Sequence, residues 1–117
     1  MKSKRPKPQY LTAGGKRLVV LEEAEYERLA RSADAWEPDL PQPNERGNYP
    51  LEALTIALAR DILRARRKLG LSQAELARRA GIRPETLNRI EQGKHSPSVA
   101  TVDKIDRALK KAEKEEA

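Results

Sequence analysis

Side chains suited to reading the edges of DNA bases cluster in one short stretch of this 117-residue chain, at Glu85, Thr86, Asn88 and Arg89. An arginine can grip guanine through O6 and N7, an asparagine can pair with N6 and N7 of adenine, and a glutamate can accept from N4 of cytosine. Glu85 could instead act by repelling the wrong site electrostatically. This chemistry requires a helix that begins near Pro84, because base edges are within reach of its first two turns. The alternative is that Asn88 and Arg89 are ordinary solvated residues.

A second set of residues could hold DNA phosphates on either side of this stretch. Gln73, with Ser72 and the backbone N–H groups around them, would do so at the start of a preceding helix, while Arg83 and Lys94 bracket the base-reading residues. Such contacts position a protein on DNA and do not specify a sequence. His95 is expected to be a surface or phosphate-adjacent residue and not a ligand.

A dense basic run precedes both sets, at Arg64, Arg66, Arg67 and Lys68. A helix turns once every 3.6 residues, so only some of these four can face DNA, and we expect at least two to be solvated. The positive charges together predict strongly salt-dependent binding, since neutralised phosphates release counterions.

The elements that must position these side chains are two short helices joined by a turn. Ser72 and Glu75 form a capping-box pattern that predicts a helix start, and Gly81 is typical of a helix end because it adopts positive φ without steric cost. Pro84 suits the first position of the next helix. Ala77 is small enough to lie where the helices cross. The apolar contacts that fix the crossing are predicted at Leu76, Ile82, Leu87 and Ile90.

This run, with its closing Arg-Ile-Glu-Gln-Gly-Lys and the later Ser-Pro-Ser, resembles the XRE helix-turn-helix family, which includes Cro and λ repressor. The resemblance covers roughly residues 62–109. It implies that the second helix lies in the major groove and that the protein is a dimeric transcriptional repressor with a palindromic operator. It also implies a structural role for Glu91. Matched to the family motif, the outward positions are Pro84, Glu85, Asn88 and Arg89, whereas Leu87 and Ile90 point inward.

Composition limits both the size and the chemistry of the protein. Hydrophobic residues make up 38% and charged residues 36%, with no Phe and one Trp, so the core must be built from aliphatic side chains, as in small helical bundles. The absence of Cys and the single His exclude disulfides, a thiolate nucleophile and a His-based metal cluster. The net charge of +6 favours an anionic partner. Residues 18–50, with three basic and eight acidic residues, are acidic instead.

The predicted fold is mainly α: a four- to five-helix λ-repressor-like DNA-binding bundle with a small N-terminal β-hairpin and helix. Gly14-Gly15 between two strand-like runs predicts the hairpin, and an apolar stripe of Tyr26, Leu29 and Ala33 predicts the helix after it. The expected organisation is a disordered basic tail (1–8), a hairpin and helix for dimerisation or partner binding (9–36), a Pro-rich linker (37–50), the helix-turn-helix domain (51–111) and a frayed charged tail (112–117). The preferred dimer surface is the helix predicted over 98–109.

The N-terminal unit has a resemblance of its own. Its Lys-Arg-Leu-Val-Val-Leu-Glu-Glu-Ala-Glu-Tyr-Glu-Arg-Leu run is similar, over about 15 residues, to the start of Phd and YefM-type antitoxins, although it is much shorter than their full domain. Similar leaders occur in XRE-type antitoxins, which implies a toxin partner of the RelE or HigB kind. The acidic patch favours a basic partner. Alternatively, the unit only dimerises the protein or covers an apolar surface. The candidate partner-binding residues are Leu18, Val20, Tyr26 and Leu29.

A DNA-binding regulator with an antitoxin role has competing alternatives in other functional classes. A plain repressor without a toxin, or a coactivator-like adaptor that docks on other proteins, would use the same bundle. An enzyme has almost no support, because no catalytic pair has workable spacing and Asp61, Asp103 and Asp106 have no metal-site pattern. We therefore expect no catalytic, cofactor or metal site. Without a signal peptide or about 18 consecutive apolar residues, we expect a cytoplasmic protein with no membrane partner.

Overall fold

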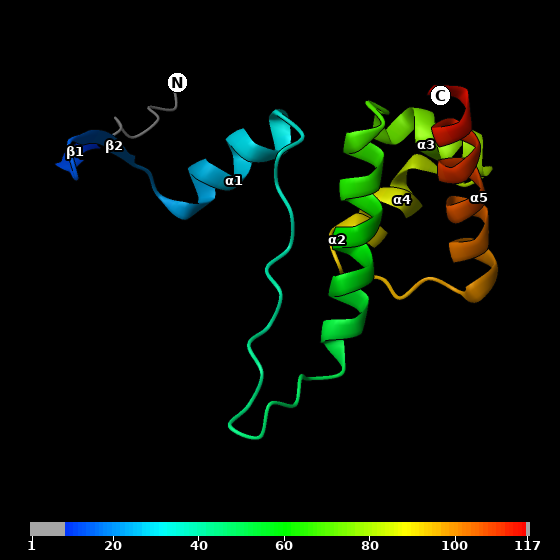
Figure 1. The fold of residues 1–117 in the computed structure, drawn as a ribbon, viewed down its shortest axis with the longest axis horizontal. Helices are drawn as coiled ribbons and strands as arrows, with labels where there is room; N and C mark the ends of the chain where they lie inside the picture. The colour runs from blue at the N-terminus through cyan, green and yellow to red at the C-terminus, as the bar shows by residue number, and fades with distance from the viewer. Residues whose placement is uncertain (1–8, 117) are drawn as a thin grey trace, which may run out of the picture. The chain divides into compact units, whose positions relative to one another are not determined.

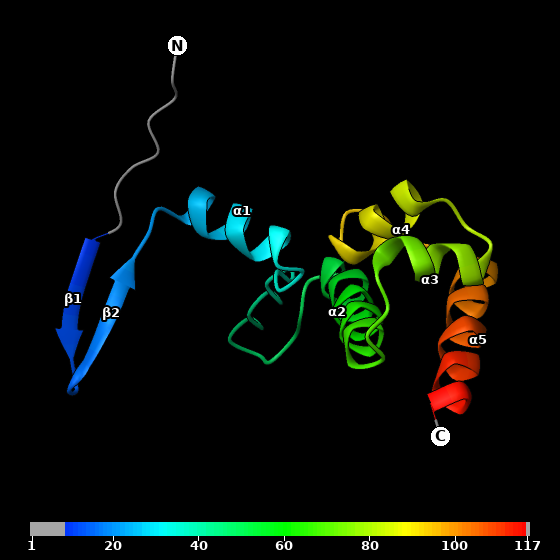
Figure 2. The same ribbon diagram turned by 90° about the horizontal axis from the view of Figure 1, so that it is seen from above.

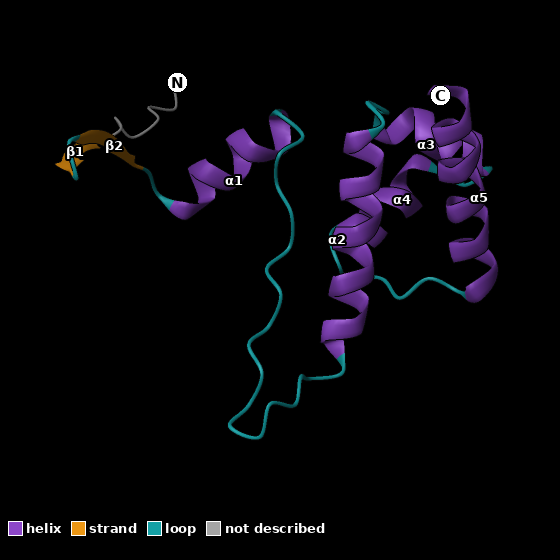
Figure 3. Cartoon of the chain, viewed as in Figure 1, coloured by secondary structure: helices purple, strands orange, loops and turns teal. Residues whose placement is uncertain are grey.

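A computed structural model describes residues 9–116 of the chain, and its elements follow in the order β1, β2 and then α1 to α5 (Figures 1 and 3). This confirms the predicted mainly α fold with a small N-terminal hairpin. The chain separates into two compact units whose boundary in sequence lies between Trp36 and Glu37. The expected tail over residues 1–8 lies outside the described residues.

The first unit begins with the β-hairpin. Strands β1 (Gln9–Ala13) and β2 (Lys16–Val20) are antiparallel, with Leu11 opposite Leu18. Gly14 and Gly15 have φ values of 56° and 75°, the conformation that a two-residue turn between twisted strands requires. All ten strand residues are exposed. The hairpin therefore has neither of its faces covered within the part of the chain that the structure describes.

Helix α1 (Glu23–Ser32) follows, and it buries much less than its apolar pattern predicts. Only Ala30 is buried in this helix, beneath a turn in which the backbone N–H groups of Ala35 and Trp36 donate to its carbonyl oxygen. Tyr26 and Leu29 are 56% and 44% exposed. The predicted stripe thus forms one side of a helix without packing against a core, because no other described element of this unit covers it.

The second unit is a bundle of four helices: α2 (Glu52–Lys68), α3 (Gln73–Ala80), α4 (Pro84–Glu91) and α5 (Val99–Glu116). Figure 2 shows α3 and α4 joined by a short turn, and α2 contacts both α4 and α5. The small side chain of Ala77 is fully buried, as predicted. The core that surrounds it is built from aliphatic residues and includes Ile62, Leu76, Leu87, Ile90 and Ile105.

The C-terminal helix is longer than predicted. We expected the chain to fray from residue 112, but α5 continues to Glu116. Ala112 is buried, and the Glu115 carboxylate accepts a hydrogen bond of 2.8 Å from Arg79 on α3. These contacts with a distant part of the chain hold the last turns in place.

The Pro-rich segment before α2 also makes specific contacts where it begins. The Glu37 carboxylate pairs with Arg64 at 2.6 Å and with Arg60 at 3.1 Å, and Arg60 donates to the Pro38 carbonyl oxygen. Pro38 is buried, close to Gly93. The hydrogen bonds from Arg64 hold the pKa of Glu37 below its ordinary value. The first residues of the expected linker are therefore anchored on α2.

Candidate nucleic-acid interface

Helix α4 presents the predicted base-reading residues because two of its side chains are pinned inward. Leu87 and Ile90 are 0% and 1% exposed, and Pro84 opens the helix after Arg83, whose backbone is extended. The opposite side of the helix carries the predicted readers. Glu85, Asn88 and Arg89 are exposed there, and Thr86 is half-buried.

A buried ion pair fixes α4 against α2. Arg66 donates through Nε and Nη2 to the two Glu91 carboxylate oxygens, both at 2.8 Å, and through Nη1 to the Leu71 carbonyl oxygen at 2.9 Å. Arg66 is 0% and Glu91 3% exposed. This gives Glu91 the structural role that the family resemblance implied. Arg66 therefore faces neither solvent nor DNA, the two environments that we expected for the basic residues of this run.

The ion pair continues outward to the predicted phosphate-binding glutamine. Gln73 Nε2 donates to Glu91 Oε1 at 2.9 Å and to Asn88 Oδ1 at 3.3 Å. A chain of hydrogen bonds therefore runs from the buried Arg66 to the exposed Asn88. It joins the start of α3 to the outer side of α4, so that a candidate phosphate contact and a candidate base contact are held side by side.

The start of α3 is capped by Ser72, the first of the two residues in the predicted Ser72–Glu75 capping box. Ser72 Oγ accepts a hydrogen bond of 3.1 Å from the backbone N–H of Glu75. The Glu75 carboxylate accepts from Arg78 and Arg79, which lower the pKa of Glu75 to about 2. The Ser72 side chain thus serves the helix start, and the cations of the last turn of α3 are engaged by acidic residues.

The cations beside α4 are arranged differently. Arg83 and Lys94, on either side of α4, are exposed, as is Arg89 within it. Among the described residues, none of these three takes part in an ion pair. His95 is exposed next to Lys94. Positive charge near the base-reading side chains is therefore available to an incoming phosphate.

Sequence reasoning missed the two contact networks that organise this unit. One is the Glu37 anchor on Arg60 and Arg64, for which the sequence carries no local signal, since 27 residues separate Glu37 from Arg64. The other is the Arg66–Glu91 pair. It had a signal, because Arg66 lies four residues after Ile62 and so on the apolar side of α2. A charged residue at such a position needs a buried partner.

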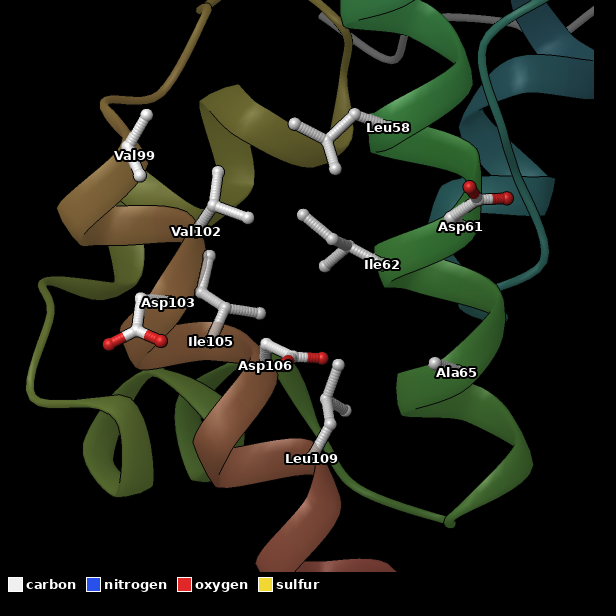
Figure 4. A pocket seen from close by; sticks show the side chains of 10 residues that line it. All are labelled: Leu58, Asp61, Ile62, Ala65, Val99, Val102, Asp103, Ile105, Asp106 and Leu109. Atoms are coloured by element: carbon white, nitrogen blue, oxygen red, sulfur yellow. The ribbon is translucent and has the colours of Figure 1, made fainter.

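An apolar groove lies between α2 and α5, away from the readers on α4 (Figure 4). It has a volume of about 480 Å³, and the side chains of Leu58, Ile62, Val102 and Ile105 point into it. Asp61, Asp103 and Asp106 also contribute to its lining, and Figure 4 shows the carboxylates of Asp61 and Asp103 directed away from the groove. Val99, at the start of α5, is 87% exposed, and Leu54, one turn before Leu58, is 77% exposed. The groove is lined in part by α5, the helix that we predicted as the dimer surface.

The described residues hold no cluster of three His, Cys, Asp or Glu side chains that could bind a metal ion. Within the same part of the chain, no helix combines the length and the apolar character that crossing a membrane demands.

Comparison with known proteins matches this unit to a helix-turn-helix family model over residues 62–115. The chain is similar to an uncharacterised HTH-type transcriptional regulator of Methanothermobacter thermautotrophicus, with 45% identity over 51 residues, which are 43% of this chain and 74% of that protein. It is also 45% identical over 44 residues to two uncharacterised HTH-type transcriptional regulators of Archaeoglobus fulgidus. Those matches span 38% of this chain and 63% and 62% of the two relatives.

Proposed function

Because the chain belongs to the helix-turn-helix family of DNA-binding transcriptional regulators, we propose that it is a repressor that reads an operator with the outer side of α4. The observation that carries this is the exposure of Glu85, Asn88 and Arg89 on a helix whose other side is fixed by Leu87 and Ile90. A rigid helix that projects planar polar groups from its first turns is suited to the major groove.

Each candidate residue then has a role that its surroundings support. Arg89, which has no acidic partner among the described residues, grips guanine. Asn88, held through Oδ1 by Gln73, offers its amide N–H groups to a base acceptor. Glu85 accepts from cytosine or repels the wrong site, and Thr86 makes at most a minor base contact. Phosphates are held by the α3 start and by cations beside α4, which together comprise Ser72, Gln73, Arg83 and Lys94.

The repressor is proposed to act as a homodimer on a palindromic operator. A twofold axis would place two copies of α4 in successive major grooves about 34 Å apart. The groove between α2 and α5 supports a dimer contact. Val99, which lines it, and Leu54, one turn before Leu58, are largely exposed, and a second copy could cover both. Burying them would remove apolar surface from water, which stabilises association.

The first unit is proposed to bind a protein partner, in the setting of an antitoxin that represses its own operon. Leu18, Val20, Tyr26 and Leu29 are between 43% and 56% exposed. An isolated two-stranded hairpin is at best marginally stable, so a partner strand or helix would stabilise it. The acidic residues of α1 favour a basic partner, which fits an RNA-cleaving toxin of the RelE or HigB kind. An adaptor, or a repressor without a toxin, would leave the same surface for other proteins.

The experiment that tests the repressor is a selection of bound duplexes from a random pool, followed by binding titrations on the selected duplex. Arg89→Ala should weaken specific binding by about 5- to 150-fold, which corresponds to the 1–3 kcal/mol of a good bidentate contact, and should relax preference at one base pair. Arg46→Ala is the matched control, because this arginine is also exposed but lies in the segment before α2. Selection of no sequence at moderate salt would refute the repressor and favour the adaptor, and equal losses on specific and random duplexes would refute the role of Arg89.

A further inference from the structure

The segment that precedes α2 packs against the end of α4. Of residues 37–51, only Pro38 is buried. A Cβ atom added to Gly93, which follows the C-cap of α4, would lie 3.7 Å from Cβ of Pro38 and 3.1 Å from Cγ1 of Ile56. Pro38 and Ile56 therefore border the place where the chain leaves the proposed DNA-reading helix, and the missing side chain of Gly93 lets them approach its backbone.

Two arginines of α2 hold Pro38 in this place. Ile56, Arg60 and Arg64 follow one another at intervals of four residues and so form one row along the helix. The Glu37 carboxylate pairs with Arg64 at 2.6 Å and with Arg60 at 3.1 Å. Arg60 also donates to the Pro38 carbonyl oxygen at 3.0 Å. Proline has no backbone N–H, so this bond satisfies the one polar backbone group of Pro38, which is therefore anchored without an unpaired polar group.

The turn that Pro38 contacts carries a proposed phosphate-binding residue, Lys94. Gly93 has a φ of 74°, and its N–H donates to the Ile90 carbonyl oxygen at 3.0 Å. The N–H of Lys94 donates to the Arg89 carbonyl oxygen at 3.3 Å. The backbone of Lys94 is thus tied to α4 and adjoins a glycine that packs against Pro38, whereas Lys94 itself is exposed.

We propose that Pro38 is a positioning residue of the DNA interface: it supports the turn after α4 and thereby holds Lys94 where it meets a phosphate. This rests on the proposed function, which assigns the phosphate to Lys94. Pro38 itself touches no DNA, and the Glu37 ion pairs act only by keeping it in place. A cation that is held before binding loses less conformational freedom when the phosphate arrives, which strengthens the contact. The DNA-binding unit therefore includes residues 37 and 38, ahead of the domain predicted over 51–111.

Counterion release sets the upper limit of the expected effect. One neutralised phosphate contributes about −0.9 to the slope of log K against log salt concentration, which amounts to about eightfold in affinity at about 0.1 M salt relative to 1 M. Lys94→Gln should lose this contribution. Pro38→Gly keeps the cation but loosens its support, so it should weaken binding by about two- to fourfold, within that limit. Affinities for the operator and for a random duplex should fall by the same factor, because phosphate contacts carry no sequence information.

The test is a set of mutant cycles in the full-length protein. Pro38→Gly is combined with Lys94→Gln and, separately, with Arg83→Gln, which removes the proposed phosphate contact before α4. Pro43→Gly is the matched control, because it makes the same change in the same segment but at an exposed proline. Fluorescence anisotropy at one salt concentration gives the affinity of each variant for a duplex selected from a random pool and for a scrambled duplex. Circular dichroism verifies that each variant is folded at the temperature of the titration, and Pro38→Ala, which retains Cβ, replaces Pro38→Gly if the latter unfolds.

The expected result is a loss with Pro38→Gly in the wild-type and Arg83→Gln backgrounds, no further loss in the Lys94→Gln background, and wild-type affinity for Pro43→Gly. An equal loss in all three backgrounds would reduce Pro38 to a general effect on stability and overturn the proposal, as would wild-type affinity of Pro38→Gly. If Lys94→Gln binds like the wild type, the proposal also fails, although selection of a sequence would leave the repressor standing. If no sequence is selected, the repressor fails, whereas the losses on the scrambled duplex still decide the role of Pro38.

Discussion

Breaking the buried ion pair between α2 and α4 should destabilise the second unit far more than its surface ion pairs would suggest. The perturbation is Glu91→Leu, which leaves the fully buried Arg66 guanidinium without its carboxylate. It also removes the acceptor that holds Gln73. An uncompensated buried charge cannot be hydrated without opening the core, and that is the physical origin of the cost.

The expected magnitude is about 3–5 kcal/mol of unfolding free energy, the usual cost of removing one partner from a buried pair. A small domain of this kind has a total stability of about 5–15 kcal/mol, so the loss is a large share of it. At roughly 4–8 °C per kcal/mol, the melting temperature should fall by at least about 12 °C. Arg66→Met should be costly as well, because Glu91 is then buried without its cation.

The double variant Arg66→Met/Glu91→Leu separates the lost charge pair from lost packing. Two apolar side chains of suitable volume can replace a buried pair with little net cost. The double variant still loses about 1–3 kcal/mol of unfolding free energy, because the Leu71 carbonyl oxygen is left without its donor. We expect the double variant to lie within about 2 kcal/mol of the wild type, and therefore to show a coupling energy of about 3 kcal/mol or more.

Urea unfolding followed by circular dichroism measures all four proteins of this cycle. The control cycle uses the exposed pair of Asp103 and Arg107 on α5, which lies at 3.0 Å with side chains 51% and 80% exposed. There each single substitution should cost less than about 0.5 kcal/mol. If the substitutions at Arg66 and Glu91 add without coupling, or if Glu91→Leu costs no more than the surface control, the reasoning about buried charge is refuted.

Two further predictions concern the backbone and the pH dependence of this unit. Gly93→Ala should destabilise more than Gly81→Ala in thermal unfolding: both glycines have positive φ, near 70°, which costs an alanine about 1 kcal/mol, but only at Gly93 would the new Cβ also press on Ile56, 3.1 Å away. Equal losses would show that Ile56 yields freely. The Glu75 carboxylate, whose pKa Arg78 and Arg79 lower from 4.5 to about 2, should stabilise the fold above pH 4.5 and lose this contribution as the pH falls toward 2. Glu75→Gln should therefore flatten the fall of unfolding free energy over that range, and an unchanged pH profile would contradict the assignment.

Local sequence signals were sufficient for the hairpin turn and for the boundaries of α3 and α4, but not for the end of α5. The Gly14-Gly15 turn, the Ser72 cap, Gly81 with its φ of 70° and Pro84 at the start of α4 all act within a few residues of themselves. The apolar residues of α2 that recur every three or four positions, Leu54, Leu58, Ile62 and Ala65, likewise depend only on the pitch of a helix. Such signals are legible in one sequence because the backbone geometry that they satisfy is local.

Tertiary structure decided which side chains of different elements contact one another. Arg66 could have been a surface cation until the fold brought Glu91 to it from 25 residues away. Gln73, predicted to meet a phosphate, also donates to Asn88 and Glu91, two acceptors that only the packing of α4 against α3 supplied. The sequence determined where α3 and α4 begin and end and which side of each is apolar, whereas the last turns of α5 and the partners of buried polar groups depend on the packing of distant segments. Hydrogen bonds and ion pairs act over a few ångströms. A linear sequence pattern does not say which distant residues the fold brings that close together.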